Sequence, residues 1–353
     1  MINKPIVING AGLSGLVAGI NLVNAGCRVI IREKERDCGL RFKNDFQGIS
    51  NWMMNMDMLA FMKTMDIKID FYVSTVDSGI FLGPGRKNQA NFKTTHSLLY
   101  LVRRGKLPGC LDYSLKRQFL KKGGLINFDQ SGLEDADIIA VGPQKAKFRT
   151  LGYNFKTDLG DIVCEIMDDN IAPKGYAYLL IRNGCGTLGS ILVQNYEGHD
   201  KSLDSAVEIF QKEFNLKIDQ KEKFSGFAGF ANPKTAIFGN KLYVGEAAGF
   251  TDGFTGFGMF YAIRSGYLAA KSIIENKNYD TLWKNDFGNL LKAGIVNRFF
   301  YEAIGNMGLK WAPGFIKKNC YKLPDILRKS YSFGFIHKII FPFAISRMKN
   351  KLN

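Results

Sequence analysis

The stretch Pro5-Ile-Val-Ile-Asn-Gly-Ala-Gly-Leu-Ser-Gly15 decides the fold of this 353-residue chain. Its first half, residues 5–9, is a short apolar run that predicts a buried strand. Its second half has the pattern GxGxxG and leads into an apolar run, residues 16–25, with the composition of a helix. Strand, glycine turn and helix in this order are typical of a dinucleotide-binding unit.

Each glycine of the pattern has a physical role. Gly10 makes the tight turn, Gly12 lets the backbone approach a pyrophosphate, and Gly15 allows the helix to pack closely on the strand. A second apolar strand, residues 28–32, ends at Glu33, which lies 18 residues after Gly15. An acid at this position can bond both ribose hydroxyls and disfavours a 2′-phosphate. The sequence therefore predicts the adenosine diphosphate part of a ligand of the NAD or FAD type.

A second glycine-dense stretch, residues 244–270, has the same order of strand, glycine loop and helix as the first. It follows an apolar strand at residues 241–244, carries five glycines between Gly245 and Gly258, and continues into a helical run. Glycines let the backbone come close to a flat ligand and aim N–H groups at it. Together the two stretches predict one large ligand held at two points.

The composition allows a large core and excludes several classes. With 46% hydrophobic and 13% aromatic residues, the chain is globular or membrane-associated and long enough for two domains. The N-terminus lacks the pattern of a signal peptide, so we expect a cytoplasmic protein. The six cysteines form no CxxC pair and no other metal-ligand spacing is found, which predicts reduced thiols and no metal site.

Alternating apolar residues between 151 and 216 predict an antiparallel sheet followed by a helix. Tyr176 and Tyr178 alternate with Ala177 on one of these strands, so both side chains point to the same face. If that face borders the ligand, the two tyrosines are candidate catalytic residues that shape the cavity or donate a proton. The alternative is that they only pack between the sheet and a helix.

Three segments resemble one family. Residues 6–34 resemble the FAD-binding start of the two-domain flavoproteins that include para-hydroxybenzoate hydroxylase. Gly245-Glu-Ala-Ala-Gly-Phe250, with Asp252, Gly256 and Ala262-Ile-Arg-Ser-Gly266, resembles the second flavin motif of the geranylgeranyl reductase family. A third segment, residues 175–184, is similar to the strand that faces the substrate in that family. The resemblance covers residues 3–285.

The resemblance implies FAD as the cofactor and a role for each motif residue. Glu33 would bind the adenosine ribose, Arg104 would lie near the ribityl and phosphate region, and Glu246 would bond the ribityl hydroxyls. Backbone N–H groups at residues 255–258 would face the pyrimidine edge of the flavin, where a helix N-terminus stabilises the negative charge of the reduced ring. The expected cofactor-binding residues are Gly10, Gly12, Leu13, Ser14, Gly15, Glu33, Lys34, Arg104, Glu246, Thr255, Gly256, Phe257, Gly258 and Met259.

The chain departs from the family pattern at two points. The acid of the second motif is Glu246 where the family has Asp, so the carboxylate is one methylene longer. The middle motif, normally Asp-Gly after a strand, stands here as Ala140-Val-Gly-Pro143 and lacks the aspartate. The second departure puts in doubt the mode of nicotinamide-dependent reduction. The electron donor, NAD(P)H or a ferredoxin-like protein, stays open.

Positive charge concentrates at the C-terminus. From residue 292 onward there are twelve Lys/Arg against two acids, so ten of the sixteen excess charges lie in the last 62 residues. Aromatic side chains are interspersed, and no run reaches the roughly 20 apolar residues that span a bilayer. This mixture favours an anionic membrane surface as a partner. A solvated helical cap is the alternative, and we expect no nucleic-acid partner because no binding motif is present.

The expected fold is α/β: a three-layer Rossmann-like FAD-binding domain, an inserted antiparallel-sheet substrate domain and a C-terminal helical region. The FAD-binding domain comprises residues 1–70, 101–150 and 236–285. The substrate domain comprises 71–100 and 151–235, and the basic aromatic helical region comprises 286–353.

The resemblance implies an FAD-dependent oxidoreductase that reduces double bonds of an isoprenoid or other large apolar, lipid-like substrate. We expect it to act at a membrane surface, peripherally on the inner face. One alternative is a monooxygenase that hydroxylates or epoxidises an apolar substrate. Another is a membrane-associated flavin- or lipid-binding protein that has lost turnover, which the altered middle motif favours.

Overall fold

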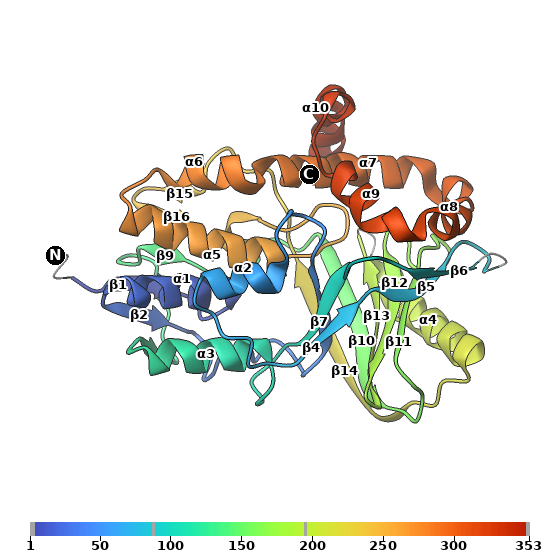
Figure 1. Cartoon of the computed structure of the whole chain (residues 1–353), viewed down its shortest axis with the longest axis horizontal. Helices are drawn as coiled ribbons and strands as arrows, with labels where there is room; N and C mark the ends of the chain where they lie inside the picture. The colour runs from blue at the N-terminus through green and yellow to red at the C-terminus, as the bar shows by residue number, and fades with distance from the viewer. Residues whose placement is uncertain (1–3, 87–88, 194–195, 351–353) are drawn as a thin grey trace.

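The structure, a computed structural model, describes residues 4–86, 89–193 and 196–350. Its elements fall into a parallel sheet with helices at one end, a large sheet at the other, and a row of C-terminal helices across both (Figure 1). This arrangement confirms the expected α/β class with a Rossmann-like domain, a sheet domain and a C-terminal helical region.

The first sheet, called the parallel sheet below, has the order β15-β16-β9-β1-β2-β8. From β8 to β16 this is the order 3-2-1-4-5 of a doubly wound nucleotide-binding sheet. All neighbours pair in parallel except the edge pair β15 and β16. The strands are β15 (Ile237–Phe238), β16 (Lys241–Tyr243), β9 (Ile138–Ile139), β1 (Ile6–Asn9), β2 (Val29–Arg32) and β8 (Leu125–Asn127).

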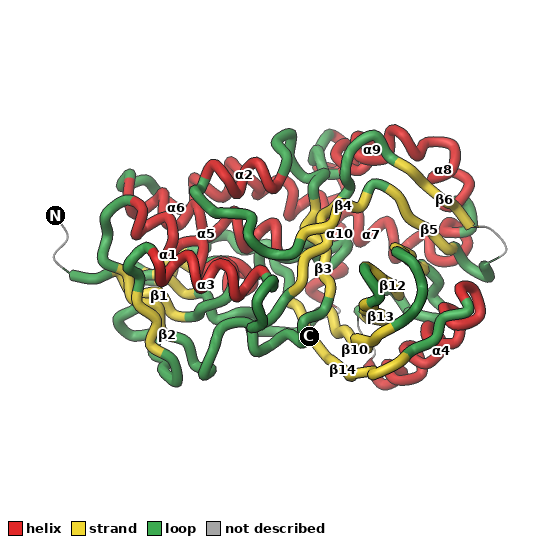
Figure 2. The backbone as a smooth tube through the Cα atoms, turned by 60° about the horizontal axis from the view of Figure 1, so that its bottom comes forward, coloured by secondary structure: helices red, strands yellow, loops and turns green. Residues whose placement is uncertain are grey.

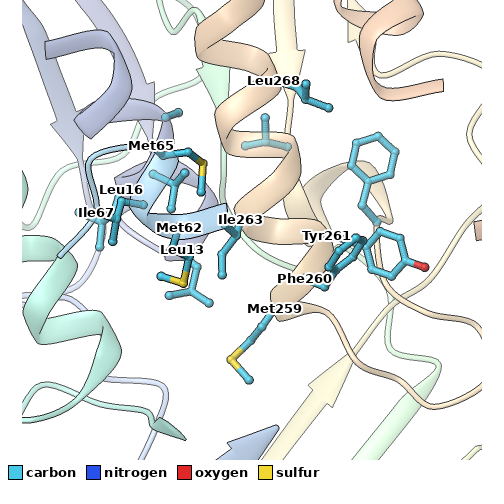
Figure 3. Packing of buried hydrophobic residues seen from close by; sticks show 14 of the residues in the cluster. Leu13, Leu16, Met62, Met65, Ile67, Met259, Phe260, Tyr261, Ile263 and Leu268 are labelled. Carbon is cyan, nitrogen blue, oxygen red and sulfur yellow. The ribbon is translucent and has the colours of Figure 1, made fainter. Parts of the chain in front are cut away.

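One face of the parallel sheet is covered by α1 (Leu13–Asn24), α3 (Leu111–Lys121) and α5 (Met259–Ile274), with α1 packed against the other two. Ile8 of β1 and Ile31 of β2 are fully buried on this face. A further helix, α2 (Met58–Thr64), packs on α1 and α5, and its Met62 lies beside Leu13 (Figure 3). Met58, Met62 and Met65 are therefore core residues.

Helix α2 does not extend back to Trp52, although the methionine-rich stretch of the sequence begins there. It begins at Met58 because Asp57 caps it, accepting from the backbone N–H groups of Leu59 and Ala60 at 3.0 Å each. An aspartate at the N-cap fixes the first turn of the helix, so the residues before Asp57 lie outside the helix.

The small sheet, with the order β3-β7-β4, is antiparallel and lies between the parallel sheet and the large sheet (Figure 2). Its strands are β3 (Phe46–Ser50), β7 (Leu99–Arg103) and β4 (Val73–Val76). β4 falls within the segment 71–100 that was assigned to the substrate domain, whereas the strands that follow it join the large sheet.

The large sheet has the order β14-β10-β13-β12-β11-β5-β6 and is antiparallel except where β11 meets β5. Figure 2 shows it curving around, with α4 (His199–Phe214) on its outer side. Its strands are β14 (Asp219–Ala228), β10 (Phe148–Lys156), β13 (Cys185–Leu192), β12 (Tyr176–Arg182), β11 (Ile162–Ile166), β5 (Ser78–Leu82) and β6 (Gln89–Lys93).

The C-terminal helices run from above α5, at the parallel-sheet end, to the end of the large sheet, and α10 stands out from α7 (Figure 1). They are α6 (Tyr279–Trp283), α7 (Asn289–Leu309), α8 (Ala312–Asn319), α9 (Leu323–Ser330) and α10 (Phe335–Asn350). Across the described residues, none of the helices has the length and apolar character that a membrane span requires.

Candidate cofactor and substrate site

The glycine turn after β1 is as tight as the pattern predicts. Gly10 has φ +108°, and a Cβ there would lie 2.3 Å from the carbonyl oxygen of Ala140. A Cβ on Gly15 would lie 2.0 Å from the carbonyl oxygen of Gly10, so α1 can approach β1 only with glycine at both positions. Gly12 differs, because the nearest atom to its Cβ position is 4.0 Å away. The space over Gly12 is therefore free for a ligand.

Glu33 lies at the carboxyl end of β2, next to this turn. One carboxylate oxygen accepts from the N–H of Ala11 at 2.7 Å and the other from the N–H of Glu35 at 3.1 Å. The first turn of α1 carries no acidic side chain and no side-chain cap. The first-turn N–H groups of α1 are thus not capped by a side chain, and the nearest acidic group is Glu33 at Ala11. Lys34, in contrast, is exposed and forms an ion pair with Glu35 at 3.6 Å.

The second glycine stretch lies against the first. The short helix η2 (Gly245–Ala248) follows β16, and a Cβ on Gly245 would lie 2.8 Å from Ser14 Oγ. A Cβ on Gly266 of α5 would lie 2.3 Å from the carbonyl oxygen of Ser14. These contacts bring the two predicted segments together and give Ser14 a packing role. The side chains of Leu13 and Met259 are buried in the core (Figure 3), so only their backbone can contact a ligand.

Glu246 faces Arg41, a residue that the sequence reasoning missed. Arg41 Nη1 lies 2.9 Å from Glu246 Oε2, and the same guanidinium donates to the carbonyl of Phe227. Glu246 Oε1 lies 3.5 Å from the Cβ position of Gly258 at the start of α5. The carboxylate therefore lies between the loop after β2 and the N-terminus of α5. The sequence feature that could have indicated Arg41 is a basic residue shortly after Gly39.

Arg104 is almost completely buried and is engaged by protein groups. Its Nε and Nη2 atoms donate to the two carboxylate oxygens of Asp112 at 2.8 and 2.9 Å, and Nη1 donates to Gln47 at 3.2 Å. The guanidinium also lies over the ring of Phe42 at 4.0 Å. Arg104 thus ties α3 to the loop that carries Arg41, and its contact with a cofactor stays a prediction.

The loop at residues 252–258 is organised by the buried Asp252. Asp252 Oδ2 accepts from the N–H and hydroxyl of Thr255 at 2.7 and 2.5 Å, and the Asp252 carbonyl accepts from the N–H of Gly256 at 3.0 Å. The Thr255 hydroxyl accepts from the N–H of Phe257 at 3.2 Å. Three of the four N–H groups expected to face a ligand are therefore used inside the loop. Within the described chain, the N–H of Gly258 has no acceptor and stays available.

Tyr331, which follows α9, reaches back to the same aspartate. Its hydroxyl donates to Asp252 Oδ2 at 2.7 Å, and both residues are buried. Burial raises the pKa of Asp252, and the other carboxylate oxygen, Oδ1, has no partner among the described residues. The C-terminal region is thus part of the loop's support.

Tyr176 and Tyr178 share a face of the large sheet, as the alternation predicts, with ring centroids 6.4 Å apart. Tyr176 donates its hydroxyl to the carbonyl of Thr255 at 2.7 Å, which joins the sheet to the glycine loop. Tyr178 lies over Gly189, where a Cβ would be 2.6 Å from the hydroxyl. Burial raises the pKa of both tyrosines, so both are weak acids at this place. Their catalytic role stays a prediction.

Trp52 is a further residue that the sequence did not indicate. Its ring centroid lies 5.9 Å from that of Phe257, beside the glycine loop. Its Nε1 is buried and has no acceptor among the residues that the structure describes. A buried donor without a partner is costly, which favours a polar ligand or ordered water at this point.

Among known proteins, no family model matches the chain, and no curated protein matches it. Solved structures share its fold. A geranylgeranyl bacteriochlorophyll reductase-like protein from Thermoplasma acidophilum is similar with a TM-score of 0.72 and 16% identity, with 98% of each chain covered. The flavin-dependent brominase Bmp2 has a TM-score of 0.63 and 15% identity, with 98% of this chain and 99% of that chain covered. The p-nitrophenol 4-monooxygenase from Pseudomonas putida has a TM-score of 0.64 and 11% identity, with 93% of this chain and 98% of that chain covered.

Proposed function

We propose that the chain binds FAD across its two glycine segments and is an FAD-dependent oxidoreductase. The observation that carries this proposal is the meeting of the two segments at the carboxyl edge of the parallel sheet, where Ser14 contacts both Gly245 and Gly266. Ligands of doubly wound sheets bind at this edge. The residues present fit the cofactor, because the space over Gly12 is open and the N–H of Gly258 is available.

Each part of the site would hold one part of the cofactor. The N-terminus of α1 would bind the pyrophosphate, Glu33 the adenosine ribose and Glu246 the ribityl hydroxyls. The N-terminus of α5 would stabilise negative charge at the pyrimidine edge. When bound, FAD supplies hydride transfer, and the protein supplies binding, orientation and proton control.

Replacing Glu246 with Ala is expected to weaken FAD binding roughly tenfold, since about 1.4 kcal/mol of hydrogen bonding to the ribityl hydroxyls is lost. Titration of the purified protein with FAD, followed by flavin fluorescence, measures the effect. Glu222→Ala, at an exposed position on β14, is the control for loss of an acidic side chain. Equal FAD affinity in the wild type and Glu246→Ala would contradict the assigned orientation. Absence of FAD uptake by the wild type would contradict the proposal itself and favour a binding protein without turnover.

The proposed reaction is reduction of double bonds in an isoprenoid or another large apolar substrate. Its support is the motif resemblance and the shared fold with a protein described as geranylgeranyl bacteriochlorophyll reductase-like. The substrate would lie against the inner face of the large sheet, which presents Tyr176, Tyr178 and Leu180. Reduced FAD, generated by NAD(P)H or by a ferredoxin-like donor, would be reoxidised as the product forms.

A monooxygenase is the second candidate, because the monooxygenase and the brominase share the fold at TM-scores of 0.64 and 0.63. The two reactions differ in their need for oxygen. Anaerobic turnover of an apolar alkene by the reduced protein supports the reductase. A product that incorporates oxygen, formed only in air, supports the monooxygenase instead.

The C-terminal region is proposed to bind an anionic membrane surface. Its exposed large apolar side chains are Phe300, Ile304, Met307, Trp311, Phe315, Tyr321, Phe335, Ile336, Ile339 and Phe343. Trp311 is 80% exposed and Met307 81% exposed, and the exposed Lys317 and Lys318 lie nearby on α8. Exposed aromatic side chains among lysines suit the headgroup region of an anionic bilayer.

Replacing Trp311 with Ala is expected to weaken binding to vesicles of anionic phospholipid roughly tenfold, because a buried aromatic ring contributes on the order of 1.5 kcal/mol. Co-sedimentation with vesicles measures the effect, and zwitterionic vesicles should bind less protein. Phe238→Ala is the matched control, since Phe238 is 54% exposed on β15 outside the C-terminal region. Equal binding of both variants would show that α8 does not contact the lipid.

A further inference from the structure

The two faces of β12 lie in different environments. Ala177, Leu179 and Ile181 are fully buried against α4 on one face. Tyr176, Tyr178 and Leu180, on the other face, stay partly accessible although protein surrounds the two tyrosines. This face is therefore not closed by packing, and the accessible space in front of it is called the hollow below. This hollow lies on the side where Tyr176 meets the glycine loop.

Glu165 of β11 belongs to the same face. The antiparallel register pairs it with Tyr178, and directly paired residues of neighbouring strands point to the same side. On its other side Glu165 is paired with Phe81 of β5. Within the described chain, the Glu165 carboxyl has no hydrogen bond and no ion pair. A carboxyl group is therefore placed beside the hollow with aromatic rings as its neighbours.

This setting changes the acidity of Glu165. Burial raises the pKa of its carboxyl to about 7, and no other group offsets the effect. Strand β5 presents no titratable side chain. The titratable or charged groups near the face are Tyr176 and Tyr178 on β12, Asp45 before β3, Asp252 in the glycine loop, and Tyr301, Arg298 and Glu302 on α7.

The neighbours of Glu165 do not compete with it as proton donors near neutral pH. Burial raises the pKa of Tyr176, Tyr178 and Tyr301, so these hydroxyls keep their protons. Arg298 is held by Glu302 at 2.9 Å. A proton donor works best when its pKa lies near the working pH. Burial also raises the pKa of Asp252 and Asp45, but hydrogen bonds inside the protein hold both carboxylates. The Glu165 carboxyl has no such partner among the described residues, and this difference selects it as the donor.

We propose that Glu165 is the catalytic proton donor to a substrate bound in this hollow, an inference that rests on the proposed reductase function. Reduction of a carbon–carbon double bond adds a hydride to one carbon and a proton to the other. The hydride brings both electrons and comes from the reduced flavin, which is oxidised. The proton comes from the Glu165 carboxyl, whose O–H bond breaks as the C–H bond forms. Water then protonates the carboxylate again.

The protonation state of Glu165 can be measured without turnover. The infrared difference between the wild type and Glu165→Gln isolates this carboxyl from the other acids of the protein. It should contain a protonated-carboxyl band at pH 5 that disappears as the pH rises through about 7. The difference between the wild type and Glu208→Gln, which removes an exposed carboxyl from α4, should lack a band that titrates near 7. Absence of the titrating band from the Glu165→Gln difference would overturn the proposal.

Stability gives a second measure. A carboxyl whose pKa is raised by folding supports the folded state at pH values below its unfolded pKa, and this support is lost as the pH rises through the folded pKa. Glu165→Gln removes the ionisation, so its melting temperature should exceed that of the wild type at pH 8 and match it at pH 4. No pH dependence of this difference would contradict a raised pKa.

Measuring turnover distinguishes a failure of the proposed role of Glu165 from a failure of the proposed reductase function. Glu165→Gln should bind FAD and be reduced by dithionite as the wild type is, and its kcat for alkene reduction should fall by roughly 10²–10⁴-fold. If Glu165→Gln had the same kcat and the same pH profile as the wild type, the role of Glu165 would be overturned and the reductase function would be left intact. Failure of the wild type to bind FAD or to reduce an alkene would refute the proposed function, whatever the carboxyl titration shows.

Discussion

Replacement of Arg104 with Ala is expected to lower the free energy of unfolding by about 3–5 kcal/mol. The reason is the fully desolvated pair that Arg104 forms with Asp112, whose side chains are 7% and 2% exposed. Removing the guanidinium leaves the Asp112 carboxylate buried without its counter-charge. The N–H of Gly105, at 3.0 Å, would be one of its few remaining donors. A loss of this size is a large part of the 5–15 kcal/mol that stabilises typical proteins.

Urea unfolding followed by circular dichroism measures this loss. Arg117→Ala is the matched control, because Arg117 lies on α3 as Asp112 does and pairs with Asp70, but its side chain is 56% exposed. Exposed ion pairs contribute about 0–1 kcal/mol, so this variant should stay close to the wild type. The double variant Arg104→Met with Asp112→Leu should recover part of the loss. Equal stability of Arg104→Ala and Arg117→Ala would contradict a buried pair.

Replacement of Asp252 with Ala is expected to cost about 3 kcal/mol and to weaken FAD binding at least tenfold. The side chain accepts from the N–H and hydroxyl of Thr255 and from the hydroxyl of Tyr331. Its loss leaves these donors unsatisfied in the interior and releases the loop that orients Gly258 at the N-terminus of α5. The same residue thus supports both the fold and the proposed cofactor site.

Tyr331→Phe separates the two effects, because it removes one hydroxyl and keeps the ring in place. We expect it to cost about 1 kcal/mol and to leave the Asp252–Thr255 contacts intact. Thermal unfolding and FAD titration of both variants give the comparison. If Asp252→Ala bound FAD as the wild type does, the loop would not depend on this aspartate and its predicted role would be wrong.

The parts of the fold that sequence reasoning predicted are those encoded locally. The unit β1–α1–β2 is continuous in sequence, and its glycines are required because a Cβ on Gly15 would lie 2.0 Å from the carbonyl oxygen of Gly10. The shared face of Tyr176 and Tyr178 follows from the period of two along one strand. These patterns need no knowledge of what packs against them.

The parts that sequence reasoning missed depend on contacts between distant segments. Arg41 and Glu246 are separated by 205 positions, and no local pattern indicates their pairing. The position of Glu165 depends on the register between β11 and β12, which a shift of one residue would reverse. Arg104 was expected at the cofactor from its motif position, but the buried Asp112 that engages it gave no sequence signal.

The bond between Asp252 and Tyr331 also has a consequence for the synthesis of the protein. Tyr331 lies 79 positions after Asp252, so the glycine loop receives this support only when these further residues have been synthesised. A nascent chain that already contains both glycine segments still lacks the hydroxyl that completes the loop. We therefore expect FAD to be loaded once residue 331 has left the ribosome. Stalled chains that end before residue 331 should retain little flavin, and chains stalled with residue 331 outside the ribosome should retain more.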